Sequence, residues 1–244
     1  MDRVGETTTA TLEPAVRPHA LLGEQYADLE QQHHAATTGM WVFLATEVMF
    51  FGTLFVALSV YRYWYGEAFE RTSERLNWQI GCINTLVLLV SSFTIVMAVR
   101  YAQLGRRKPV VRCLGLTAAL GLLFLVFKGI EYYLDYRESL IPDWKFDPQE
   151  WTAEFGLAAD QVPQVKLFLT FYWIMTLFHA LHVTIGICAV LVMMLLAARG
   201  RFSPEYYSPV EVTALYWHFV DIVWIFLLPM LYLLGTHSLE RWKL

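Results

Sequence analysis

Residues 39–61 read GMWVFLATEVMFFGTLFVALSVY, an apolar stretch that holds one acidic side chain, Glu47, and no basic one. A helix needs about 20 predominantly apolar residues to cross the roughly 30 Å hydrocarbon core of a bilayer, so this stretch predicts a transmembrane helix. The pattern recurs in four further apolar runs, at residues 80–99, 110–127, 165–198 and 212–234. The sequence therefore predicts an integral membrane protein.

Composition supports this class. Of 244 residues, 57% are hydrophobic and 16% are charged, whereas a soluble domain carries about 25% charged residues. Backbone groups in hydrocarbon must satisfy their own hydrogen bonds, so the spans are expected to be helices. We predict an all-α bundle of five transmembrane helices, at about residues 39–63, 78–101, 110–136, 165–198 and 209–236.

The remaining residues predict one membrane domain over residues 39–244 and a polar N-terminal segment over residues 1–38. Residues 24–38 are expected to form a short helix at the cytoplasmic surface. No apolar signal-peptide core precedes the first span, which is expected to act as its own insertion signal. Five spans place the two ends on opposite sides, and the short basic loop RRKP at residues 106–109 favours a cytoplasmic N-terminus and a periplasmic C-terminus. No basic cluster with interleaved aromatic residues indicates a nucleic-acid partner.

Glu47 is expected near the middle of the bilayer, about 12 Å along its helix from Gly39. An acidic side chain there costs about 2.5–3.5 kcal/mol on insertion scales, so it tends to face protein or water. Its helical neighbours include Phe43, Phe50 and Phe51, and no cation. We expect a largely neutral acid that donates one hydrogen bond to another helix or to a trapped water. A role in proton handling and a structural role both remain open.

The third span ends in FKGIEYYLDY, residues 127–136, where Lys128 and Glu131 are spaced i, i+3. The two can pair on one helix face near the outer boundary. Alternatively, each side chain can extend to water at the interface.

Histidines mark the fourth and fifth spans. His179 and His182 are spaced i, i+3 in FYWIMTLFHALHVTIG, and His218 and Asp221 have the same spacing in EVTALYWHFVDIVWIFLLP. Metal sites need three or four ligands, and heme-b subunits place axial histidines on facing helices. We predict a hydrogen-bonded His–Asp and His–His layer between the two helices without metal, with heme ligation as the alternative.

The second span carries a polar stripe in INTLVLLVSSFT, where Asn84 and Ser91, and Thr85 and Ser92, repeat at i, i+7. Such stripes join membrane helices by close packing and hydrogen bonds. No P-loop, HExxH, GxSxG or dinucleotide motif occurs. The residues therefore predict a bundle with an internal polar seam and no catalytic centre of its own.

Taken in order, these motifs resemble one family, subunit III of heme-copper terminal oxidases. The resemblance covers about residues 39–235, and places Glu47 at the family's membrane-embedded glutamate. Two departures stand out: the first two helices of the seven-helix form are missing, as in five-helix bacterial members, and the family's Gly-Phe-His-Gly is Leu177-Phe178-His179-Ala180 here.

The resemblance implies a subunit without redox cofactors in a complex that reduces oxygen to water in a bacterial plasma membrane. The hemes and copper would lie in partner subunits, with the catalytic subunit I in direct contact, and subunit II, a small subunit IV and a respiratory supercomplex as further partners. The implied roles are to hold structural phospholipid, maintain proton uptake and protect the oxidase during turnover.

Other functions remain open at this stage. Cytochrome c is the expected electron donor, with quinol as the alternative, and a subunit of a nitric-oxide-reducing system lies within the same class. From different classes, the rivals are a heme-b electron-transfer subunit and a small secondary transporter that uses Glu47. A transporter predicts an internal repeat or broken helices, and the sequence shows neither.

Overall fold

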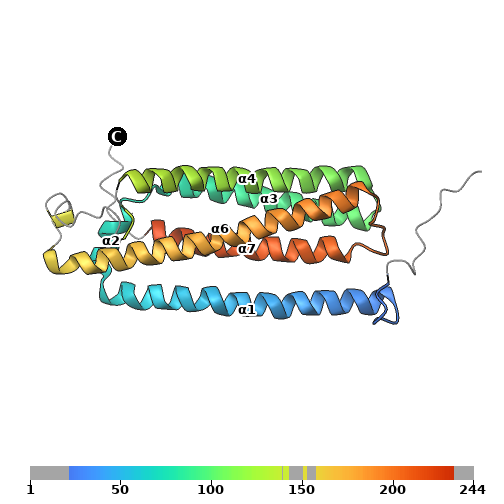
Figure 1. Cartoon of the computed structure of the whole chain (residues 1–244), viewed down its shortest axis with the longest axis horizontal. Helices are drawn as coiled ribbons and strands as arrows, with labels where there is room; N and C mark the ends of the chain where they lie inside the picture. Colours follow the sequence, from blue (N-terminus) through green and yellow to red (C-terminus); the bar gives the residue numbers. More distant parts are fainter. Residues whose placement is uncertain (1–21, 139, 143–150, 153–157, 234–244) are drawn as a thin grey trace, which may run out of the picture.

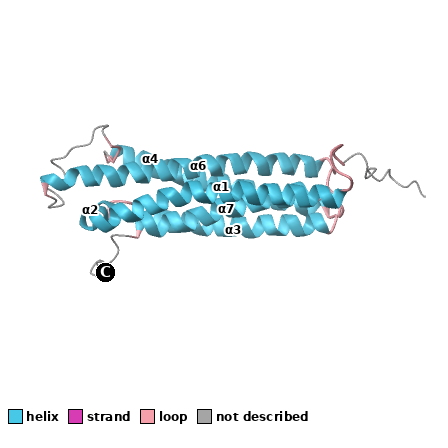
Figure 2. Ribbon diagram, turned by 90° about the horizontal axis from the view of Figure 1, so that it is seen from below, coloured by secondary structure: helices cyan, strands magenta, loops and turns pink. Residues whose placement is uncertain are grey.

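The computed structural model describes residues 22–138, 140–142, 151–152 and 158–233. Within these ranges the chain is helical and has no strand (Figure 2). Five helices are long and apolar enough to cross a membrane, which confirms the predicted five-span fold: α1 (Leu29–Trp64), α3 (Trp78–Gln103), α4 (Arg107–Arg137), α6 (Val162–Ala198) and α7 (Ser208–Tyr232). A short helix, α2 (Gly66–Ser73), and a 3-10 turn, η2 (Ala159–Gln161), complete the described elements.

The start of α1 corrects one prediction. Residues 24–38 do not form a separate surface helix, because α1 runs without a break from Leu29. Asp28 caps this helix, and its carboxylate accepts a hydrogen bond from the backbone N–H of Gln31 at 2.7 Å. Neither a proline nor a turn follows the cap, so the polar segment continues directly into the apolar one. The expected end of the last span at residue 236 lies outside the described residues.

Two glycines end the helices on the side of the molecule where α1 begins. Gly105 and Gly200 have φ angles of 68° and 75°, a conformation that glycine adopts without the penalty of a Cβ atom. The N–H groups of Arg106 and Arg201 then reach back to the carbonyls of Tyr101 and Leu196, at 2.9 and 3.2 Å. This pattern stops a helix sharply. It allows α4 and α7 to return at once through the bundle.

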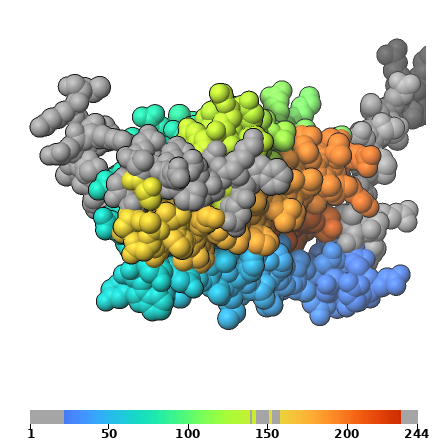
Figure 3. Space-filling view, turned by 60° about the vertical axis from the view of Figure 1, so that its left-hand side comes forward, coloured from blue at the N-terminus to red at the C-terminus, as the bar shows by residue number. Residues whose placement is uncertain are grey.

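Four helices form the main bundle, and α1 lies against one side of it. Helix α3 packs against α4 and α7, and α6 also packs against α4 and α7. Helix α1 contacts mainly α7 and, to a lesser extent, α6 (Figure 1). In the apolar 18-residue stretch of α1, 17% of the residues are buried within the chain, against 56% in the corresponding stretch of α7. In Figure 3, the first part of α6 (yellow) lies next to α1 (blue to cyan), and the later part of α6 (orange) lies farther from it.

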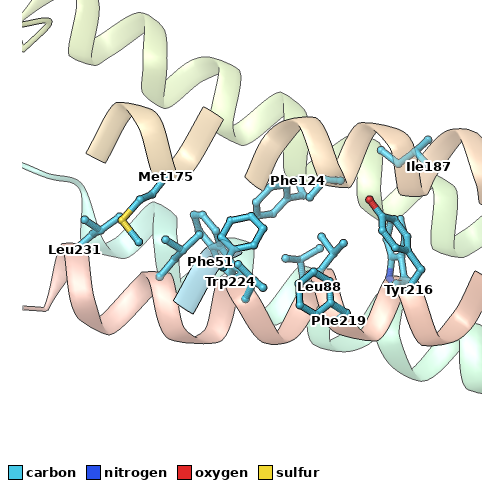
Figure 4. Packing of buried hydrophobic residues seen from close by; sticks show 14 of the residues in the cluster. Phe51, Leu88, Phe124, Met175, Ile187, Tyr216, Phe219, Trp224 and Leu231 are labelled. Carbon is cyan, nitrogen blue, oxygen red and sulfur yellow. The ribbon is translucent and has the colours of Figure 1, made fainter. Parts of the chain in front are cut away.

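The core of the bundle is built around the indole rings of α7. Trp217 and Trp224 are both almost fully buried. Gly121 of α4 and Gly186 of α6 make room for Trp217, because a Cβ atom at these positions would lie 2.6 and 3.0 Å from its ring. Trp224 meets Phe124 of α4 edge-on at 4.9 Å between ring centroids (Figure 4). The indole rings of α7 thus reach across the bundle to α4 and α6.

Candidate functional site: polar contacts between the helices

Glu47 finds its partner on another helix. Its Oε2 lies 3.1 Å from Nε2 of His182, so α1 and α6 are joined by one polar contact. The two side chains are 19% and 13% exposed within the chain. The ring of Phe51 lies edge-on to the imidazole at 5.2 Å between centroids. The interhelical hydrogen bond expected for Glu47 is present, and its partner is a histidine.

The second ring nitrogen of His182 limits where protons can lie in this pair. His182 Nδ1 is 2.7 Å from the carbonyl oxygen of Phe178. A carbonyl only accepts, so Nδ1 carries a proton, and a neutral imidazole then has a bare Nε2. The Glu47–His182 contact therefore contains one proton, either as a neutral acid beside a neutral imidazole or as a carboxylate beside an imidazolium. Both forms can make the hydrogen bond.

The polar stripe of α3 accepts hydrogen bonds from α7. The indole N–H of Trp217 donates to Ser91 Oγ at 3.0 Å, and that of Trp224 donates to Thr85 Oγ1 at 3.1 Å. Ser92 Oγ bonds Nδ1 of His218 at 2.6 Å. The prediction that this stripe joins helices is confirmed for these three hydroxyls. The fourth member, Asn84, is fully buried, and its side chain has no hydrogen-bond partner among the described residues.

The predicted histidine–aspartate layer between α6 and α7 is wrong. His179 makes no hydrogen bond to any described residue and instead stacks on Trp224, with ring centroids 5.1 Å apart. Asp221 is 3% exposed, and its carboxyl lies close to Ser92 without forming a hydrogen bond. Residues three apart differ by about 60° around a helix. That angle is enough to direct His182 to α1 while His179 enters the core.

Lys128 and Glu131 pair inside the protein rather than reaching water. Their Nζ and Oε2 atoms are 3.1 Å apart, and the side chains are 2% and 0% exposed. This contact is an ion pair whose geometry falls short of a hydrogen bond. Lys128 donates instead to Tyr232 Oη at 2.8 Å, and that hydroxyl donates to Glu131 Oε1 at 2.6 Å. Through Tyr232, the pair connects α4 to the end of α7.

Further polar groups complete this cluster, and the sequence reasoning missed them. Tyr172 of α6 contacts Asp135 Oδ2 at 2.6 Å and Glu131 Oε1 at 3.1 Å. Asp135 is itself 2% exposed. It follows Glu131 by four residues and Lys128 by seven, so helical spacing places all three on one face of α4. That spacing was the available signal for Asp135, whereas Tyr172 and Tyr232 come from other helices and gave none.

An apolar groove runs between α1 and α7. It has a volume of about 850 Å³, and its walls are aliphatic and aromatic side chains with Ser59 and His218 as the polar exceptions. Phe51 and Phe219 touch across its floor, with ring centroids 6.2 Å apart. Gly52 leaves the α1 wall open, because nothing lies within 4 Å of where its Cβ would be. Such a groove can receive an acyl chain.

The histidines do not converge on a metal or heme site in the described part of the chain. No group of three or more His, Cys, Asp or Glu side chains in that part could hold a metal ion. A heme bound through His179 would have to displace Trp224 and Phe124, which pack on the imidazole at 5.1 and 5.6 Å. The His182 ring nitrogens face Phe178 and Glu47. As packed, neither His179 nor His182 is open to a heme.

Comparison with known proteins identifies relatives over most of the chain. A family model described as cytochrome c oxidase subunit III matches residues 151–236. Cytochrome c oxidase subunit 3 of Thermostichus vulcanus is 31% identical over 201 residues, which cover 80% of this chain and 86% of the relative. Probable cytochrome c oxidase subunit 3 of Mycobacterium leprae is 32% identical over 197 residues, with the same coverage of 80% and 86%.

Subunits of quinol oxidases match equally broadly. Quinol oxidase subunit 3 of Bacillus spizizenii is 29% identical over 230 residues, which cover 91% of this chain and 99% of the relative. The similarity thus extends over subunits of both kinds of oxidase.

Proposed function

Because this chain belongs to the subunit III family of heme-copper terminal oxidases, we propose that it is the lipid-holding, structural subunit III of a proton-pumping oxygen reductase. It is a multi-pass membrane protein and part of a multi-subunit oxidase complex. In this proposal the hemes and copper reside in partner subunits. The chain packs directly on the catalytic subunit I within a bacterial plasma membrane, and subunit II, a small subunit IV and a respiratory supercomplex are its further partners.

The observation that carries this proposal is the apolar groove between α1 and α7. Its walls offer extended hydrocarbon contact and few polar groups, the chemistry that suits lipid acyl chains. Helix α1 is the outer wall, and Glu47 anchors it to α6 through His182. A protein built to hold lipid needs such a wall at a fixed distance from the bundle, and the Glu47–His182 contact provides the fixed point.

A structural role for Glu47 follows from the same contact. The pair already contains its proton and both partners, so it can hold α1 in place without exchanging that proton during turnover. The family's support of proton uptake would then be indirect, through the position of α1 and the lipid behind it. Proton transfer through Glu47 itself is the second candidate, supported by the two proton positions that the His182 tautomer allows.

Basic residues support an N-terminus in the cytoplasm. Arg106 lies in the α3–α4 connection, and Arg107 and Lys108 begin α4. The α6–α7 connection carries Arg199 and Arg201. Both connections are short and lie on the side where α1 begins, and short basic loops remain on the cytoplasmic side. The end of α7 would accordingly face the periplasm.

Cytochrome c is the proposed electron donor, and quinol is the alternative because relatives with either name match the chain. Purification of the native complex, followed by heme typing and oxygen-uptake assays with each donor, tests both. Deletion of this chain tests its role: the oxidase should keep its hemes and its initial rate but inactivate faster during turnover and retain less phospholipid. A complex that loses a heme when this chain is deleted would overturn the proposal.

A further inference from the structure

A buried polar cluster joins α4, α6 and α7 and consists of Lys128, Glu131, Asp135, Tyr172 and Tyr232. If both acids are ionised, the cluster has fewer protons than its hydrogen bonds require. Tyr172 Oη lies within hydrogen-bond distance of two carboxylates, 2.6 Å from Asp135 Oδ2 and 3.1 Å from Glu131 Oε1. A phenol has a single proton to donate. Tyr232 cannot make up the difference, because its own proton goes to Glu131 Oε1 at 2.6 Å. If both acids were ionised, one Tyr172 contact would bring lone pairs together.

The charges of the cluster also indicate that Glu131 and Asp135 are not both ionised. Lys128 supplies one positive charge, and Glu131 and Asp135 would supply two negative charges. The groups that face Asp135 from α4 are Lys128, Glu131 and the acidic Glu138, and from α6 Tyr172. His179 of α6 lies near Lys128, and Tyr232 of α7 faces Glu131. No second cation among these groups balances the extra acid, and an uncompensated buried charge is strongly unfavourable.

We propose that Asp135 is a proton-binding site that is occupied at neutral pH. The bound proton is donated by Asp135 to Tyr172 Oη, which frees the phenol proton for Glu131. On the other side, Lys128 donates to Tyr232, and Tyr232 donates to Glu131. Glu131 then receives two hydrogen bonds and one ion pair, and the cluster is neutral. Loss of the proton at alkaline pH would leave a net negative charge between α4 and α6.

The variant Asp135→Asn tests the site, because an amide donates to Tyr172 permanently and carries no charge. Heat-induced release of this subunit from the purified complex would be followed over a pH series. We expect wild type and Asp135→Asn to dissociate at the same temperature at mildly acidic pH. At alkaline pH the wild type should dissociate at a lower temperature than the variant. An ionised native Asp135 predicts the opposite sign, with the variant weaker at every pH, and that result would overturn the proposal.

Infrared spectroscopy supplies a second readout. The complex should lose one carboxylic-acid C=O band on Asp135→Asn, and persistence of the full band would contradict the site. Asp221→Asn is the reference, because Asp221 is also buried among the described residues. The spectrum of this variant should still contain the Asp135 band. Glu138→Gln is the matched control, because it removes a 47% exposed acid one turn away without touching Tyr172. It should leave the carboxylic-acid band in place, because Glu138 does not bind the proton of the cluster.

Discussion

At the scale of single residues, the structure gives Glu47, an acid alone in an apolar stretch, a polar contact with His182. Glu47 has no cation among its near neighbours on α1, and the imidazole that bonds to it comes from α6. Because His182 Nδ1 is committed to the Phe178 carbonyl, any replacement of Glu47 must supply a donor to keep the contact with a neutral imidazole. A substitution of Glu47 that keeps its shape and a hydrogen-bond donor, but has no proton to exchange, can therefore separate the two possible roles of this residue.

Glu47→Gln is expected to assemble and turn over nearly as wild type, since its amide N–H can donate to His182 Nε2. Glu47→Ala should weaken the attachment of α1 by about 0.6–1.7 kcal/mol, the range measured for hydrogen bonds between membrane helices. Retention of the subunit during detergent purification measures the difference. Slower proton uptake in an intact Glu47→Gln complex would instead show that this acid handles protons.

The buried ion pair makes a stronger prediction at the same scale. Lys128→Met leaves Glu131 without its cation and should cost about 3–5 kcal/mol, the usual penalty for removing one partner of a buried pair. The double variant Lys128→Met/Glu131→Gln removes both charges and should regain most of that loss. Thermal dissociation of the complex compares the three proteins. A single variant as stable as wild type would mean that water compensates Glu131 after all.

At the scale of elements, the contact between α4 and α7 depends on the absence of a side chain. A Cβ atom on Gly121 would lie 2.6 Å from the Trp217 ring and 2.9 Å from Ile187. Gly121→Ala should therefore destabilise the bundle by about 1–3 kcal/mol, as overpacked cores do. Gly129→Ala on the same helix is the control, because its Cβ would meet nothing within 4 Å. It should be neutral or slightly stabilising, and equal effects of the two changes would refute this account of the packing.

The sequence predicted elements better than it predicted contacts. Run length and hydrophobicity are local properties, and they indicated all five spans, the pairing of Lys128 with Glu131 as one of two alternatives, and the joining role of Thr85, Ser91 and Ser92. Partner choice depends on how helices are placed in space. The spacing of His179 and His182 therefore suggested one shared layer, whereas the structure directs one ring to Trp224 and the other to Glu47. Likewise, nothing local indicated that Tyr172 and Tyr232 would meet Glu131.

At the scale of the whole molecule, the groove between α1 and α7 interrupts the close packing of the helices. Gly52→Phe should fill part of the groove from the α1 wall without disturbing α7, because nothing lies within 4 Å of the place that a Cβ atom on Gly52 would take. We expect the purified complex to retain less phospholipid while its subunit composition is unchanged. Gly39→Phe, on the same helix but outside the groove, is the control. Equal phospholipid content in both variants would argue that lipid binds elsewhere.

The position of α1 also has a consequence for how the protein is made. Glu47 meets a residue 135 positions later in the chain, and the main neighbour of α1 is α7, the last of the described spans to be synthesised. At translation rates of 5–20 residues per second, Glu47 waits roughly 7–27 s for His182 to emerge from the ribosome. During that interval α1 lies in the membrane, the Glu47 carboxyl has not yet bonded to His182, and the aromatic face of α1 has not yet packed on α7. The first of the five described spans to be synthesised is thus the one that can dock only after the last of them has been made.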